Sequence, residues 1–209
     1  MLRTSEATTP PPDFEPLRLG GHAALDFLNS VLAPAGEVLD FLHDGATLAR
    51  WLAGSGAVPD TAAAAAKALT PQQLEPLAAE ARALRDWFRA LLLRWQAEGE
   101  RAVRKVDIER LNVLMSTGPL TQVIVRGPAG IEMRTQRTLD EPRALIAELA
   151  AACADLLVSR LHDKVRKCEN PACTLVFADE KRGPRRRWCS MAVCGNRMKV
   201  AAHRARQRR

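Results

Sequence analysis

Several features are missing from this 209-residue sequence, and each absence narrows the classes of protein it can represent. Tyrosine is absent, and aromatic residues make up 4% of the chain. No apolar run approaches the roughly 18 residues that a transmembrane helix requires. The N-terminal stretch MLRTSEATTPPPDFEP lacks the apolar centre of a secretory signal. We therefore expect no membrane partner and a cytoplasmic location.

Motifs of the common catalytic sites are missing too. There is no glycine-rich phosphate loop, no G-x-S-x-G turn and no metal-binding cluster outside the C-terminal cysteines. His22, Asp26 and Asn29 recur at i, i+4 and i+7, so one helical face could present all three. That face would form either a ligand pocket or a buried polar network, and we favour the network. We expect that the protein is not an enzyme.

The positive charge is concentrated at one end of the chain. The whole sequence has a net charge of +7. From Lys164 onward, fourteen lysines and arginines accompany three acidic residues, a local charge of +11, which leaves −4 for the preceding residues. Such segregation favours contact with a polyanion over a merely solubilising tail.

The chain before the basic region is predicted to be a disordered arm followed by a mainly helical domain. Residues 1–15 are rich in Thr, Ser, Glu and Pro and cannot build a core. Within 16–163, apolar spacing and propensity predict short helices over 20–32, 43–56 and 61–69. The strongest helix covers 69–96, with Thr70 and Gln73 in a capping box and Pro76 separating an initial turn from the main helix.

The rest of this domain is predicted to contain a hairpin between two helices. Residues 107–118 suit a helix with Asp107 as N-cap. Residues 120–135 alternate like two strands around the turn Gly-Pro-Ala-Gly. A long helix is expected over 141–166, with Cys153 inside its apolar stripe as a buried core residue.

Four of the five cysteines lie close together near the C-terminus. Cys168, Cys173, Cys189 and Cys194 have the pattern C-x4-C-x15-C-x4-C, which suits four thiolates around one tetrahedral zinc ion. An iron–sulfur cluster, disulfides and a Cys-Cys-Cys-His site are weaker alternatives, since the spacing differs from ferredoxins and a cytoplasmic chain rarely keeps disulfides. We predict one structural Zn²⁺ on which this segment depends for folding.

The segment around these cysteines predicts a treble-clef-like order of knuckle, hairpin and helix. The two arms of the hairpin would be Leu175–Phe177 and Arg185–Trp188, joined at Gly183-Pro184. The second cysteine pair opens a helix with no later breaker. On that helix Met198, Ala201 and Ala205 fall within about 40° of Cys194 and form the predicted inner stripe, while His203 points away from the metal.

The remaining cationic side chains of the segment are candidates for contact with phosphates and base edges. The predicted nucleic-acid contacts are Arg185, Arg186, Arg187, Arg197, Lys199, His203, Arg204, Arg206 and Arg208.

Several motifs in the chain resemble a known pair of domains. RRRWCSMAVCGNRMKVAAHRAR resembles the CGNR zinc finger, named after the residues that stand here as Cys194, Gly195, Asn196 and Arg197, and CENPACTLVF matches its first knuckle. GGHAALDFLNSV and LARWL resemble the ABATE domain that accompanies this finger. The resemblance covers roughly residues 15 to 209 and implies an ABATE-like domain over 16–163 and a finger over 164–209. It also implies a stress-induced transcription regulator.

Together these observations predict an α+β protein: a mainly helical N-terminal domain with a small β-hairpin, then a treble-clef-like zinc finger. The function we expect is zinc-dependent, DNA-binding transcriptional regulation in response to stress, with the helical domain sensing a ligand or partner. Besides DNA, a small-molecule effector and a second copy of the chain are candidate partners. The alternative is a small-molecule-binding or enzymatic N-terminal domain whose finger contacts protein or RNA.

Overall fold

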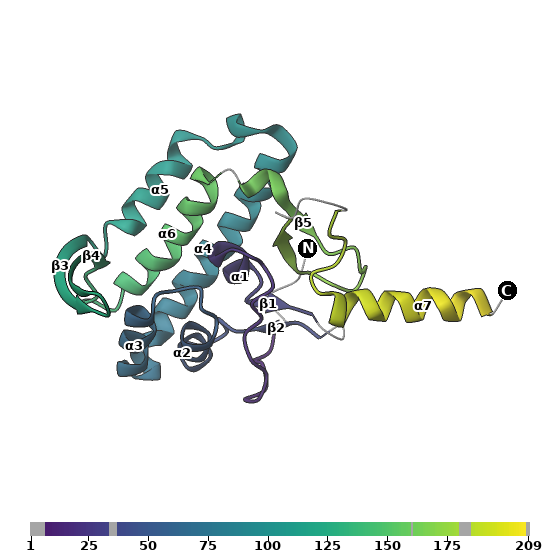
Figure 1. Cartoon of the computed structure of the whole chain (residues 1–209), viewed down its shortest axis with the longest axis horizontal. Helices are drawn as coiled ribbons and strands as arrows, with labels where there is room; N and C mark the ends of the chain where they lie inside the picture. Colours follow the sequence, from purple (N-terminus) through teal and green to yellow (C-terminus); the bar gives the residue numbers. More distant parts are fainter. Residues whose placement is uncertain (1–6, 34–36, 160, 180–184, 208–209) are drawn as a thin grey trace.

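The chain folds into a helical domain that carries small two-stranded sheets and ends in a cysteine-rich module (Figure 1). The computed structural model describes residues 7–33, 37–159, 161–179 and 185–207. Within these ranges the sheets are antiparallel pairs, namely β1 with β2, β3 with β4 and β5 with β6. The predicted α+β class, with a helical N-terminal region and a C-terminal finger, is confirmed.

The helical domain is assembled from α-helices, two short strands, one hairpin and one 3-10 turn, counting only the part of the chain that the structure describes. In chain order these are α1 (Ala23–Leu28), β1 (Val31–Leu32), β2 (Leu39–Asp40), α2 (Gly45–Gly54), α3 (Asp60–Ala68), α4 (Pro71–Glu98), η2 (Glu100–Ala102), α5 (Lys105–Met115), β3 (Leu120–Gly127), β4 (Gly130–Arg137) and α6 (Ala144–Val158).

The long helix α4 organises the core because α1, α2 and α6 all pack against it. Leu84, Phe88 and Leu91 from its apolar stripe are almost completely buried. A charged residue shares that interior. Arg85 has no exposed surface, and its guanidinium forms a bidentate pair with Asp40 at 2.6 and 2.8 Å. The pair fixes α4 to the β1–β2 sheet, since a buried guanidinium requires a partner.

Two helix starts differ from the sequence prediction. Pro76 does not break α4, which runs unbroken through it from the capping box of Thr70 and Gln73. Pro76 lies near the N-terminus of that helix, where only one intrahelical hydrogen bond is lost. Asp107 is not the N-cap of α5. It lies three residues after the N-cap Arg104, and its carboxylate accepts the backbone N–H of Arg104 at 3.0 Å.

Two further boundaries also differ. The helix predicted over 141–166 covers only Ala144–Val158, and η3 (Leu161–Lys164) and β5 (Val165–Lys167) follow it. Cys153 is fully buried in α6, as predicted.

Part of the arm predicted to be disordered lies against the domain. Thr8 exchanges backbone hydrogen bonds with Val38 and Asp40, and Phe14 packs on Phe41. Residues 1–6 lie outside the described chain.

The cysteine-rich module consists of β5, β6 (Val176–Ala178), the π-helical turn η4 (Met191–Gly195) and α7 (Asn196–Gln207). β6 pairs with β5, in the register Val165 to Ala178. The predicted pairing of Leu175–Phe177 with Arg185–Trp188 is therefore wrong, because a strand before the first cysteine occupies that edge. The predicted turn at Gly183-Pro184 lies outside the described residues.

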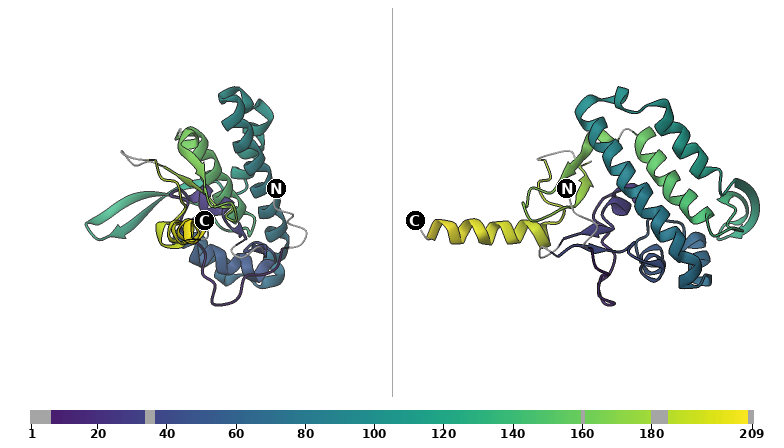
Figure 2. Two further views of the ribbon diagram at one scale, coloured as in Figure 1. Left: turned by 90° about the vertical axis from the view of Figure 1, so that its right-hand side faces the viewer. Right: turned by 180° about the vertical axis from the view of Figure 1, so that it is seen from behind.

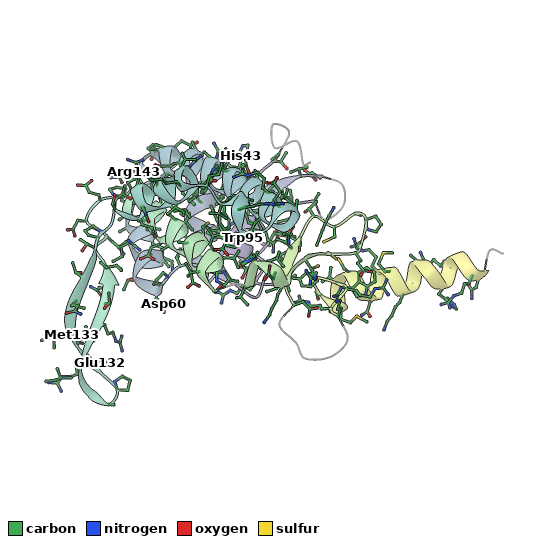
Figure 3. The ribbon with its side chains drawn as sticks, turned by 90° about the horizontal axis from the view of Figure 1, so that it is seen from above. His43, Asp60, Trp95, Glu132, Met133 and Arg143 are labelled. Carbon is green, nitrogen blue, oxygen red and sulfur yellow. The ribbon has the colours of Figure 1, made fainter. Side chains whose placement is uncertain are left out.

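Two elements protrude from opposite ends of the molecule. The β3–β4 hairpin protrudes at one end, where Glu132 and Met133 lie near its tip, and α7 protrudes at the other (Figures 1 and 3). The view from behind shows α7 standing clear of the helical domain over most of its length (Figure 2, right). Among the described residues, no helix is both long and apolar enough to cross a membrane.

Candidate metal centre and basic helix

The four C-terminal cysteines converge on one point. The Sγ atoms of Cys168, Cys173, Cys189 and Cys194 all lie within 4.8 Å of one another. The Sγ atoms of Cys173 and Cys189 are 3.8 Å apart, and those of Cys189 and Cys194 are 3.6 Å apart. A tetrahedral ion with metal–sulfur bonds of about 2.3 Å places its sulfurs about 3.8 Å apart, so the cluster has the dimensions of a zinc site with four thiolate ligands.

Each cysteine is placed by a distinct local structure. The antiparallel strands β5 and β6 bring the ends of the first knuckle together, and the N–H of Cys168 donates to the carbonyl of Leu175 at 3.0 Å. Cys189 precedes the helical segment, and Cys194 lies in its first turn, after Ser190 as N-cap. The helix N-terminus there favours the negative charge of a thiolate.

Hydrogen bonds to two of the four sulfur atoms also stabilise the thiolate form that a metal ligand requires. The N–H of Cys189 donates to the Sγ of Cys168, and the side-chain amide of Asn170 donates to the Sγ of Cys194, both at 3.4 Å. Asn170 is itself buried, and its Oδ1 accepts the N–H of Ala172 within the knuckle. This brace of the knuckle is part of the site that sequence reasoning missed. The only available signal was an Asn-Pro pair between two cysteines, which we interpreted as a turn.

Four thiols this close cannot all ionise easily without a cation. A hydrogen bond from the Cys189 thiol, the largest cause, lowers the pKa of Cys173 to about 5. The same hydrogen bond raises the pKa of Cys189, and burial raises the pKa of Cys168. A divalent ion at the centre would stabilise all four thiolates together. The donor set, spacing and buried setting fit one structural zinc.

Helix α7, which follows the metal centre, carries several basic side chains that are exposed to solvent. The basic side chains of α7 that the structure shows as exposed are Arg197, Lys199, His203, Arg204 and Arg206. The predicted inner stripe holds only at its start, since Met198 is half-buried and Ala201 is exposed. The helix has left the domain by that point, so the stripe has no surface to cover. Arg208 and the side chain of Ala205 lie outside the description.

The three consecutive arginines before Cys189 do not share one role. Arg185 is exposed, and Arg187 is exposed while paired with Glu169 at 2.6 Å. Arg186 turns inward and lies over the ring of Phe177, 4.2 Å from its centroid. Its guanidinium also donates to the carbonyls of Trp188, Cys189 and Leu19. Arg186, one of the predicted nucleic-acid contacts, thus has its Nε and Nη2 donors engaged in holding the loop beside the zinc site.

Comparison with known protein families identifies both parts of the chain. Residues 164–207 match the CGNR zinc finger. Residues 21–160, about two thirds of the chain, match the ABATE family, described as "Putative stress-induced transcription regulator". The chain belongs to the ABATE family. A comparison with curated proteins finds no match.

The ABATE domain includes the three polar residues predicted either to bind a ligand or to join elements. Nδ1 of His22 caps α1 and Nε2 lies 2.9 Å from Asp155 of α6. Asp26 accepts the N–H of Gly20 at 2.7 Å. Asn29 bonds to the backbone of Val176 in the CGNR finger. Each residue thus bonds to a different part of the chain, as expected for a network that joins elements.

Proposed function

We propose that this ABATE protein is a zinc-dependent DNA-binding transcriptional regulator whose helix α7 contacts DNA. The observation that carries the proposal is the placement of α7. The turn that leads into it holds a zinc ligand, and the rest projects from the protein with exposed basic side chains. Twelve residues of helix extend about 18 Å, and a major groove about 12 Å wide accepts one helix.

The surface beside α7 carries further basic residues that could contact DNA. A hollow of about 560 Å³ lies next to the metal centre, lined by Arg185, Arg187, Trp188 and Met191 among others. Basic side chains beside an aromatic ring suit a phosphate backbone and the bases attached to it. Zinc is a structural requirement here, since it holds the base of α7 against the loop that carries these arginines.

The ABATE domain has a supporting role in this proposal and no catalytic one. It anchors the finger through Asn29 and Gly20, both hydrogen-bonded to β6. A role in the stress response is supported by the family description alone.

The test is the salt dependence of binding to duplex DNA, measured by fluorescence anisotropy with the zinc-loaded full chain. Six or more phosphate contacts would weaken binding by about 10³-fold or more between 50 and 200 mM salt. The double variant Lys199→Ala/Arg206→Ala is expected to reduce the slope of log K against log salt by about 2. Arg126→Ala/Arg134→Ala, which removes two exposed cations from the hairpin at the opposite end, is the matched control and should leave the slope unchanged.

Failure of the wild-type protein to bind DNA at 50 mM salt would contradict the proposal. Equal weakening by Arg126→Ala/Arg134→Ala would show that overall charge, rather than α7, drives binding. Tighter binding to RNA of the same sequence would favour the alternative in which the finger contacts RNA.

A further inference from the structure

A groove on the ABATE domain, away from the metal centre, has the form of a small-molecule site. It has a volume of about 790 Å³ and lies between the end of α4 with η2, helix α5, and helix α6 with η3. Ligand sites in proteins measure about 300–1,000 Å³ and are lined mainly by apolar side chains. The walls here are largely apolar, with Trp95, Val103, Leu111, Met115 and Leu157 among them.

A buried polar atom in the lining lacks a partner. His162 is 7% exposed, and its ring stacks on Trp95 with centroids 3.6 Å apart. Its Nε2 lies 3.1 Å from a carboxylate oxygen of Asp163. Nδ1 of His162 is buried and has no hydrogen-bond partner among the described residues, and an unpaired buried polar atom is costly. A ligand with a polar group beside this ring would supply the missing partner.

The charged residues that line the groove favour a cationic ligand. Its lining includes the carboxylates of Glu100 and Asp163 and no lysine or arginine of the described chain. Two carboxylates and a ring nitrogen without a partner, beside an apolar wall, suit a molecule with an apolar body and a protonated amino group. An anionic ligand would be repelled by these carboxylates.

We propose that this groove binds a small amphipathic amine, with its apolar body against Trp95 and Leu157 and its N–H groups toward His162 and Asp163. The site lies beside the connection to the finger. His162 and Asp163 belong to η3, which leads directly into β5, and the side chain of Gln96 donates to the carbonyl of Val165 at 3.0 Å. An occupant would therefore contact the segment that positions Cys168. Binding itself does not require that the finger bind DNA.

The experiment is calorimetric titration of the zinc-loaded full chain with matched probes that differ only in their polar group. The probes are 2-phenylethylamine, tryptamine and octylamine, each compared with its alcohol and with the corresponding carboxylic acid. At least one amine is expected to bind about fivefold or more tightly than both of its analogues, the scale of one ion pair near a surface. Asp163→Asn, at an exposed carboxylate, should remove most of that preference and leave the affinity for the alcohol unchanged.

A pair of matched variants locates the binding. Val158 lines the groove and is 78% exposed, whereas Val113 is 64% exposed on α5 and does not line it. Val158→Arg places a cation at the mouth and is expected to weaken the amine about tenfold, while Val113→Arg should not change its affinity. The proposal is wrong if no amine binds better than its alcohol and acid, or if the two arginine variants weaken binding equally.

Discussion

Asn29 of the ABATE domain forms two hydrogen bonds with the backbone of Val176 in the CGNR finger. Its Nδ2 donates to the Val176 carbonyl at 2.8 Å, and its Oδ1 accepts the Val176 N–H at 2.9 Å. The side-chain amide thus acts as one more residue of a strand along β6. The core is also continuous across the boundary, since Phe177 and Cys168 belong to the same buried cluster as the helices. The finger is consequently held by the domain as well as by its metal.

Replacing Asn29 tests this connection. Asn29→Ala would leave an N–H and a carbonyl of Val176 without partners at a part-buried position, which costs about 1–3 kcal/mol per group. We expect a loss of about 2 kcal/mol or more in the free energy of unfolding, measured by urea denaturation with zinc present. Asn112→Ala, an exposed position on α5, is the control and should change it by less than about 0.5 kcal/mol. Equal effects of the two variants would rule out the connection as described.

Zinc content distinguishes the metal-binding cysteines from the buried one. The wild-type chain should retain one zinc per molecule after dialysis, and Cys189→Ser should lose it because a hydroxyl is a poor substitute for a thiolate ligand. Cys153→Ala removes a cysteine that is fully buried in α6, and it should keep one zinc. Elemental analysis measures all three. Retention of stoichiometric zinc by Cys189→Ser would exclude the assignment of four cysteine ligands.

The buried ion pair in the core should matter more than an exposed one. Asp40→Ala removes the bidentate partner of the buried Arg85 guanidinium and leaves it only Asp86 and Ser30, so we expect a loss of about 3–5 kcal/mol. Glu80→Ala removes the half-buried partner of the exposed Arg143, which should cost no more than about 1 kcal/mol. Chemical denaturation of the two variants side by side gives the comparison. Similar losses would mean that the Asp40–Arg85 pair does not fix α4.

The buried carboxyl group of Asp26 should make the stability of the fold depend on pH. Burial raises the pKa of Asp26 above its ordinary value, although hydrogen bonds from Gly20 and Leu19 oppose the shift. Because the folded-state pKa lies above the unfolded one, the unfolded chain loses this proton first as the pH rises. Stability therefore falls between the two pKa values, and the loss is complete above the folded-state pKa.

Asp26→Asn removes the charge and keeps an oxygen for the Gly20 N–H, so the melting temperature at pH 7 should rise. The gain should shrink as the pH falls below the folded-state pKa. Asp13→Asn, at an exposed position, should show neither effect. A lower melting temperature for Asp26→Asn at pH 7 would mean that the negative charge stabilises the fold.

Local patterns in the sequence were sufficient for most of the elements and for the metal ligands. Helix α4 follows from an apolar stripe and a capping box, and the β3–β4 hairpin from alternation around a glycine-rich turn. The four zinc ligands follow from cysteine spacing, because a tetrahedral ion requires close pairs of ligands on a chain that turns back. These signals involve residues near one another in sequence, so they can be read without knowing the fold.

Only the tertiary structure decided which partners distant residues meet. Sequence alone could not pair β6 with β5 or assign Asn29 to the finger, since these contacts join segments up to 147 residues apart. Nor could it separate Arg186 from Arg187: neighbouring arginines look equivalent in a sequence, yet one is used inside the protein and the other remains at the surface. Local periodicity determines how each segment folds, whereas burial and hydrogen-bond satisfaction across the whole chain determine which side chains remain exposed for function.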